Sequence, residues 1–187
     1  MNTLILGMVF FYAAHALPLV GVDAPIKAKI GAGPFKGLFS LVSLVGLGLM
    51  IWGFVMARSG PDAARIVFNP QPWAPHVTMV FVFFAFLCWG IFLHKGRLRL
   101  WLRHPMSIGV ALWAAGHLFS NGNLSEVLFF GGFLVLGLAD VLIGFARGTR
   151  PQFTPKPLHD VIAPVAGIVM YAVFFWLHPY IIGVSVY

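Results

Sequence analysis

Three ionisable side chains lie inside long apolar segments of this chain: His15, His117 and Asp140. An ionisable group in the middle of an apolar membrane segment is costly unless it is paired or binds a ligand, so such residues are candidates for function. Two imidazoles on different helices, without a pair of thiolates, do not complete a zinc site of four ligands. They suit the two axial positions of a haem, which brings its own four nitrogens. These residues therefore allow, without establishing, a haem iron bound by His15 and His117.

The rest of a haem site can also be found in the sequence. Lys27, Lys29 and Arg103 are cations that could pair with the haem propionates. The chain has no C-x-x-C-H motif, which excludes covalent attachment of a haem. His104 and His178 stay open as alternative axial ligands.

Asp140 is expected to hydrogen-bond and orient His15. With a rise of 1.5 Å per residue, His15 lies about 18 Å and Asp140 about 20 Å from the same membrane face. A carboxylate beside an imidazole is a common partner of a ligating or proton-transferring histidine. Two structural alternatives stay open. Asp140 could instead extend toward Arg147, seven residues on, and each histidine could be a neutral imidazole bonded to a neighbouring helix.

The composition indicates an integral membrane protein. Of the 187 residues, 60% are apolar and only 9% are charged, whereas a soluble domain has about 25% charged residues. The net charge of +7 comes from residues between the apolar segments and is not expected to bind nucleic acid. A single domain over residues 1–187, embedded in the lipid bilayer, fits this length. Cys88 is the only cysteine, so the chain has no internal disulfide.

Apolar segments long enough to cross a bilayer predict an all-α, polytopic bundle of about six transmembrane helices, with five as the alternative count. The expected helices cover residues 3–20, 38–56, 74–93, 100–119, 127–145 and 161–183. The first is expected to stay as a helix, because the residues MNTLIL offer no basic start for a signal peptide. Gly46, Gly48 and Gly53 are expected to let helix backbones approach closely.

The distribution of basic residues predicts the orientation. The first, third and fifth loops together contain ten Lys and Arg, and the second and fourth contain two. The positive-inside rule places the three basic loops in the cytoplasm and both termini on the outer side.

Several blocks of this sequence resemble the NnrU-domain family of membrane proteins. They are His15 with Pro18, GPFKGLFSLVSL at 33–44, the stretch RHPMSIGVALWAAGHLFSNGN at 103–123, and FFGG at 129–132. The resemblance extends over nearly the whole chain. The family is associated by name with nitrite and nitric oxide respiration, or denitrification. It implies a multi-pass protein of the bacterial inner membrane, with respiratory-complex partners.

That family is in turn similar to the plastid 15-cis-ζ-carotene isomerases, which are membrane enzymes with haem b. By motif, the two histidines of the isomerases fall on His15 and on His117 of the block Trp-x-x-x-His. The resemblance implies haem-dependent cis-trans isomerisation, or other redox-linked chemistry, on a polyene or lipid. Ala114 stands where the isomerases have a cysteine, so thiolate ligand exchange is impossible at this place.

Two other functions stay open. The chain could be a non-enzymatic membrane factor that supports nitrogen-oxide respiration, with structural or sensing histidines. A methyltransferase-like fold using Arg103, His104 and Pro105 ranks third, because the C-terminal region has only one acid, Asp160, for binding a charged nucleotide cofactor.

Overall fold

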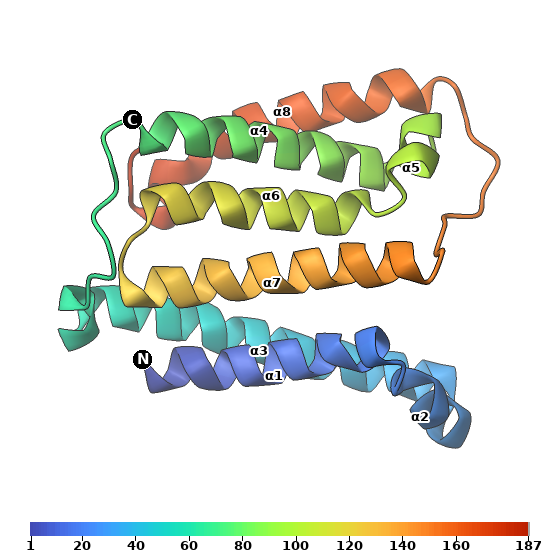
Figure 1. Ribbon diagram of the computed structural model, residues 1–187, viewed down its shortest axis with the longest axis horizontal. Coiled ribbons are helices and arrows are strands. Elements are labelled where there is room, and N and C mark those ends of the chain that lie inside the picture. The colour runs from blue at the N-terminus through green and yellow to red at the C-terminus, as the bar shows by residue number, and fades with distance from the viewer. Residues whose placement is uncertain (187) are drawn as a thin grey trace. The chain divides into compact units, whose positions relative to one another are not determined.

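The computed structural model describes residues 1–186, which form eight α-helices and one 3-10 helix, with no β-strand among them (Figure 1). The elements in chain order are α1 (Asn2–Val20), α2 (Asp23–Ile30), α3 (Ala32–Ser59), η1 (Pro61–Ala64), α4 (Ala74–Leu93), α5 (Arg97–Leu102), α6 (Pro105–Ser120), α7 (Leu124–Ala146) and α8 (His159–Ile182). The all-α prediction is confirmed.

Five helices are long and apolar enough to cross a membrane: α1, α3, α4, α7 and α8. Their outer surfaces expose large apolar side chains; Leu44 and Val135 are each 68% exposed and Trp176 is 67% exposed. Such faces suit lipid, which solvates apolar side chains as readily as a protein core does. The chain is therefore a multi-pass membrane protein. The side of the membrane on which its termini lie stays a prediction.

The predicted continuous helix over residues 100–119 is wrong, because the chain breaks between α5 and α6. Arg103 has a positive φ of 61° and His104 has φ −119° and ψ 49°, so neither residue is helical. Pro105 explains the break, since a proline disfavours the helical conformation of the residue before it. It also starts α6 well, because a residue in the first turn needs no N–H partner. The 16 residues of α6 fall short of the length of about 20 that spans a bilayer.

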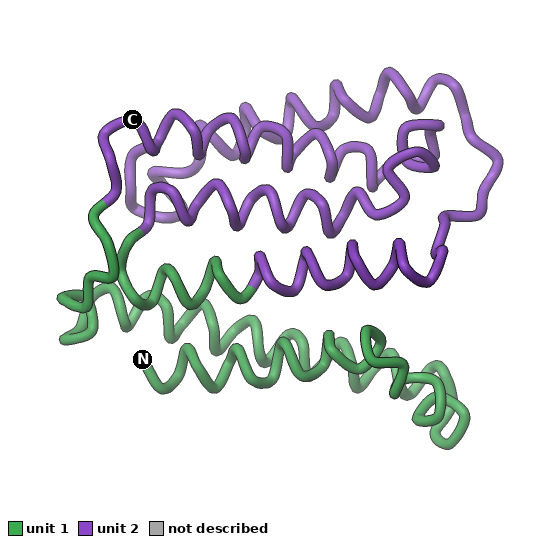
Figure 2. Tube along the Cα trace, viewed as in Figure 1, with its two compact units in different colours: residues 1–69, 122–132 green, residues 70–121, 133–187 purple. Residues whose placement is uncertain are grey.

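The chain divides into two compact units, coloured separately in Figure 2. Unit 1 comprises residues 1–69 and 122–132, and unit 2 comprises residues 70–121 with the described residues from 133 on. The division falls inside α7. Each unit has its own helix contacts and is described by itself.

In unit 1, α1 packs along α3 at very short range (Figure 1). Gly7, Gly46 and Gly53 leave room for the opposite backbone, and a Cβ at any of them would collide with main-chain atoms. Leu4 and Met50 are fully buried. The predicted close approach is confirmed for Gly46 and Gly53, whereas Gly48 faces open space.

Gly46→Ala is expected to lower the apparent melting temperature in detergent. Overpacking at this position should reduce the stability of the fold by about 1–3 kcal/mol. A Cβ at Gly46 would lie 2.7 Å from the main-chain nitrogen of Phe11, an atom that cannot move without shifting α1. Gly48→Ala, two residues on, is the matched control. It meets nothing within 4 Å and should gain up to about 1 kcal/mol from helix propensity. Equal melting temperatures for the two variants would contradict this packing.

In unit 2, α4 contacts both α6 and α8. Gly90 and Gly167 bring α4 and α8 into backbone contact, and Gly116 does the same between α4 and α6. Thr78 connects α4 to α6 by its hydroxyl, which lies 2.7 Å from the carbonyl oxygen of Gly116. Close packing by small residues and interhelical hydrogen bonds are the usual means of joining helices in lipid.

Candidate functional site

His15 lies on α1 in unit 1, with its imidazole fixed against its own helix. Its Nδ1–H donates to the carbonyl oxygen of Phe11, 2.8 Å away. A carbonyl can only accept, so the neutral ring carries its proton on Nδ1 and its lone pair on Nε2. The Phe11 ring stacks on the imidazole with centroids 4.1 Å apart, and the Phe39 ring lies 5.1 Å away. The result is an oriented imidazole in aromatic surroundings, with Nε2 able to bind a metal.

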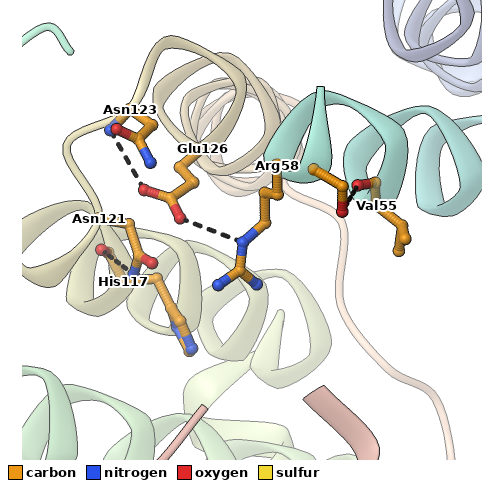
Figure 3. A network of polar contacts seen from close by, with 7 residues as sticks. Val55, Arg58, His117, Asn121, Asn123 and Glu126 are labelled. Atoms are coloured by element: carbon orange, nitrogen blue, oxygen red, sulfur yellow. Dashed lines mark hydrogen bonds and ion pairs between the residues drawn. The ribbon is translucent and has the colours of Figure 1, made fainter. Parts of the chain in front are cut away.

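His117 lies on α6 in unit 2 and shows the same local arrangement. Its Nδ1–H donates to the carbonyl oxygen of Trp113 at 2.8 Å, and the Trp113 ring lies 5.1 Å from the imidazole. Asn121 donates from Nδ2 to the carbonyl of His117 at 2.7 Å and so ties down the last turn of α6 (Figure 3). The lone pair of the neutral ring is again on Nε2.

The two histidines thus present the same potential metal-binding atom, an Nε2 with a lone pair. His15 lies in unit 1 and His117 in unit 2. Their shared role as axial ligands stays a prediction. Among residues 1–186, no group of three or more His, Cys, Asp or Glu side chains could hold a metal ion. Ala114, at the position of the isomerase cysteine, is fully buried on α6.

His94 provides an internal comparison. Its Nδ1–H donates to the carbonyl of Gly90 at 2.8 Å, as in the other two histidines. It follows the last residue of α4, where its ring lies 5.5 Å from that of His159. The hydrogen bond to the carbonyl four residues earlier therefore fixes a tautomer but does not by itself make a ligand.

Asp140, on α7 in unit 2, accepts a hydrogen bond from the hydroxyl of Ser107 on α6. Gly137 makes this contact possible one turn away, because its missing side chain lets α7 approach Ala111 and the carbonyl of Ser107 closely. The sequence analysis did not single out Ser107; a serine in an otherwise apolar helix is its only signal. The role of Asp140 toward His15 stays a prediction.

The break between α5 and α6 places two further candidates beside one aromatic ring. The guanidinium of Arg103 lies 5.2 Å from the centroid of the Phe145 ring, and the His104 ring lies 5.3 Å from it. His104 Nε2 is buried without a hydrogen-bond partner among the described residues. His178, the other alternative ligand, donates from Nδ1 to the carbonyl of Val184 at 2.9 Å.

The proposed propionate lysines lie on α2. Lys27 pairs with Asp23 and its ammonium lies 4.9 Å from the centroid of the Phe35 ring. Lys29 is exposed. Lys27 is therefore held in place, whereas Lys29 is exposed on the same helix.

Asp23→Asn is expected to lower the melting temperature slightly near about pH 7, and the difference from the wild type should shrink as the pH falls below about 3.9. The hydrogen bond from Lys27 holds the pKa of the Asp23 carboxyl below its ordinary value. A depressed pKa stabilises the fold above the unfolded-state pKa of about 3.9, and this stabilisation is lost as the pH falls through the folded-state pKa. Melting curves of both proteins from about pH 7 to pH 3 would test it; a constant difference at all pH values would contradict it.

A polar contact that the sequence analysis missed fixes the start of α7 in unit 1. Glu126, only 6% exposed, accepts a hydrogen bond from the backbone N–H of Asn123 at 3.1 Å. It also pairs with Nε of Arg58, at the end of α3, at 3.7 Å (Figure 3). An Asn followed three residues later by Glu resembles a capping box, and this spacing could have revealed the contact from sequence.

The comparisons with known proteins give a family but no characterised relative. No curated protein and no solved structure matches the chain. The family model described as "NnrU protein" matches residues 3–186, so it includes His15, His117 and both units. By this match over nearly its whole length, the chain belongs to the NnrU family.

Proposed function

We propose that this membrane protein binds haem b through His15 and His117 and performs redox-linked chemistry on a hydrophobic molecule from the bilayer. The observation that carries the proposal is that these two imidazoles lie within apolar helices, beside aromatic rings, and share one hydrogen-bonded state. Each is hydrogen-bonded through Nδ1 to a carbonyl oxygen of its own helix, so that Nε2 carries the lone pair.

This state is the one that an axial ligand needs. A ligating histidine usually donates its other ring N–H to a carbonyl or a carboxylate, which fixes the tautomer and makes the ligating nitrogen more basic. Here the helix itself provides that acceptor, at 2.8 Å for both residues. The donor set also fits haem, which needs only two ligands from the protein.

The surroundings of each imidazole are apolar and aromatic, as a porphyrin requires. Phe11 and Phe39 flank His15, and Trp113 contacts His117. Lys27, Lys29 and Arg103 are proposed to pair with the propionates. The Lys27 ammonium is already paired with Asp23, and the Arg103 guanidinium lies against the Phe145 ring. Each cation would therefore pair with a propionate from a side chain whose position is already restricted.

When bound, the haem would supply a redox-active iron, while the chain would supply position, an apolar environment and access from lipid. The exposed apolar faces of the spanning helices allow a polyene or another lipid to reach the protein without crossing water. Buried Ala114 cannot provide a thiolate, so we propose that the two imidazoles are the ligands in both oxidation states.

An absorption spectrum of the detergent-purified protein, oxidised and then reduced with dithionite, tests the proposal. We expect a b-type spectrum and a pyridine haemochrome with about one haem per chain. A colourless protein, purified after haem was supplied during expression, would overturn it. Copurification of respiratory subunits with such a colourless protein would instead support a non-enzymatic role in nitrogen-oxide respiration.

A further inference from the structure

Two neighbouring cavities lie along α1, α2 and α3 in unit 1. The first has a volume of about 250 Å³ and is lined only by apolar residues, among them Leu17, Ile26 and Val42. The second has a volume of about 290 Å³ and includes Lys27, Lys36 and Ser40 in its lining. Phe35 and Phe39 line both cavities. An apolar cavity and a cavity with two lysines therefore lie on either side of the same two aromatic rings.

The second cavity has two lysines in its lining, one already in an ion pair and one in no ion pair within the described part of the chain. Lys27 is held by Asp23 and by the ring of Phe35. Lys36 is exposed and forms no ion pair with any of residues 1–186. An anion at this place would meet two ammonium groups of which only one is already paired.

The position of the cavities relative to the spanning helices indicates that a ligand would come from the membrane. α1 and α3 are apolar enough to cross a membrane, and α2, the short polar helix between them, lies where the chain turns back. Lysines at such a turn lie at the level of the lipid headgroups, and the loop is one of those predicted to face the anionic cytoplasmic leaflet. The molecule that meets an apolar cavity and two lysines at this level is an anionic membrane lipid.

We infer that these cavities bind an anionic phospholipid, with its phosphate between Lys27 and Lys36 and an acyl chain against Phe35 and Phe39. Ser40 adds a hydroxyl that can donate a hydrogen bond to a phosphate oxygen. The inference goes beyond the haem proposal, although the two share Lys27 and Phe39, which line the cavities. Lys36 belongs to the lipid site alone, so substitution at Lys36 tests the lipid site without touching a residue of the haem proposal.

Native mass spectrometry of the detergent-purified full chain tests this site, with phosphatidylglycerol and phosphatidylcholine of identical acyl chains as probes. Wild-type protein is expected to retain phosphatidylglycerol in preference to phosphatidylcholine. Lys36→Gln should weaken phosphatidylglycerol binding about fivefold, which corresponds to about 1 kcal/mol for one lysine at an anionic surface. Phosphatidylcholine binding should not change.

Lys29→Gln is the matched control, because Lys29 lies on the same short helix as Lys27 but lines neither cavity. It should bind both lipids as the wild type does. Val42→Trp fills the apolar cavity and should weaken retention of both lipids by removing space for the acyl chain.

Three results would overturn the inference: equal retention of the two lipids by the wild type, equal losses for Lys36→Gln and Lys29→Gln, or displacement of phosphatidylglycerol by millimolar inorganic phosphate. The last would assign the lysines to a free anion. Haem content should be the same in Lys36→Gln and in the wild type, so that a failure of the lipid site and a failure of the haem site are told apart.

Discussion

His117→Ala is expected to remove the bound haem or to shift its absorption spectrum to that of a five-coordinate iron. The substitution deletes an imidazole whose Nδ1–H is fixed on the carbonyl of Trp113 and whose Nε2 carries the lone pair proposed to bind the iron. Non-covalent haem b depends on its axial ligands and its pocket for retention, since no thioether bonds hold it. Haem per chain and the spectrum of the reduced protein are the measurements.

His94→Ala is the matched control for this prediction. His94 has the same hydrogen bond to a carbonyl oxygen four residues earlier, also at 2.8 Å, but it follows the end of α4 and is not a proposed ligand. Its spectrum should equal that of the wild type. Added imidazole should partly restore the spectrum of His117→Ala. Unchanged haem content and spectrum in His117→Ala would exclude a ligand role for this residue.

Glu126→Ala is expected to destabilise the protein by about 1–3 kcal/mol. The ion pair with Arg58 contributes the smaller part, because its atoms lie 3.7 Å apart and the Arg58 side chain is 30% exposed. The substitution also leaves the backbone N–H of Asn123 at the start of α7 without its acceptor. The apparent melting temperature in detergent measures the loss.

Glu126→Gln separates the two contributions. The amide oxygen can still accept the hydrogen bond from Asn123, whereas the charge that pairs with Arg58 is gone, so this variant should melt between the wild type and Glu126→Ala. A double-mutant cycle with Arg58→Ala gives the coupling energy between the two side chains. A melting temperature of Glu126→Ala equal to that of the wild type would show that the contact contributes nothing to the fold.

The sequence predicted most helices well because length and hydropathy are what lipid requires of a spanning segment. The helix expected at residues 74–93 matches α4, and the one expected at 3–20 differs from α1 by one residue. The expected start at residue 38 was late, since α3 begins at Ala32 and continues through Gly33, Pro34 and Lys36. A hydropathy window detects only the part of a helix that lies in the hydrocarbon, and Pro34 is tolerated in a first turn.

The hydropathy pattern does not reveal the break before α6 or the start of α7, because both depend on local sequence signals. Arg103, His104 and Pro105 separate α5 from α6, but the apolar residues Leu100 to Leu102 extend the hydropathy signal of the following helix backwards. The spacing of Asn123 and Glu126 marks the start of α7 at Leu124, whereas hydropathy alone predicts a start at residue 127.

Candidate sites were less predictable because depth in a membrane does not say which helices are neighbours. The rise per residue placed Asp140 at the level of His15, but the partner that the structure gives its carboxylate is Ser107 on α6. That contact depends on Gly137 and on the face that α7 presents to α6. Likewise, the hydrogen bonds of His15 and His117 to their own helices follow from side-chain rotamers, which residue types alone do not specify.

The short helix α6 imposes a condition on the membrane itself. Its 16 residues rise about 24 Å, less than the hydrocarbon thickness of about 30 Å. For α6 to cross, the bilayer beside it must thin, so that headgroups reach Arg103 and His104 at one end and Asn121 at the other. This hydrophobic mismatch costs a fraction of a kcal/mol for each ångström, a strain that falls as the bilayer becomes thinner. If α6 crosses the bilayer, the stability of unit 2 is therefore expected to depend on lipid thickness, independently of any ligand.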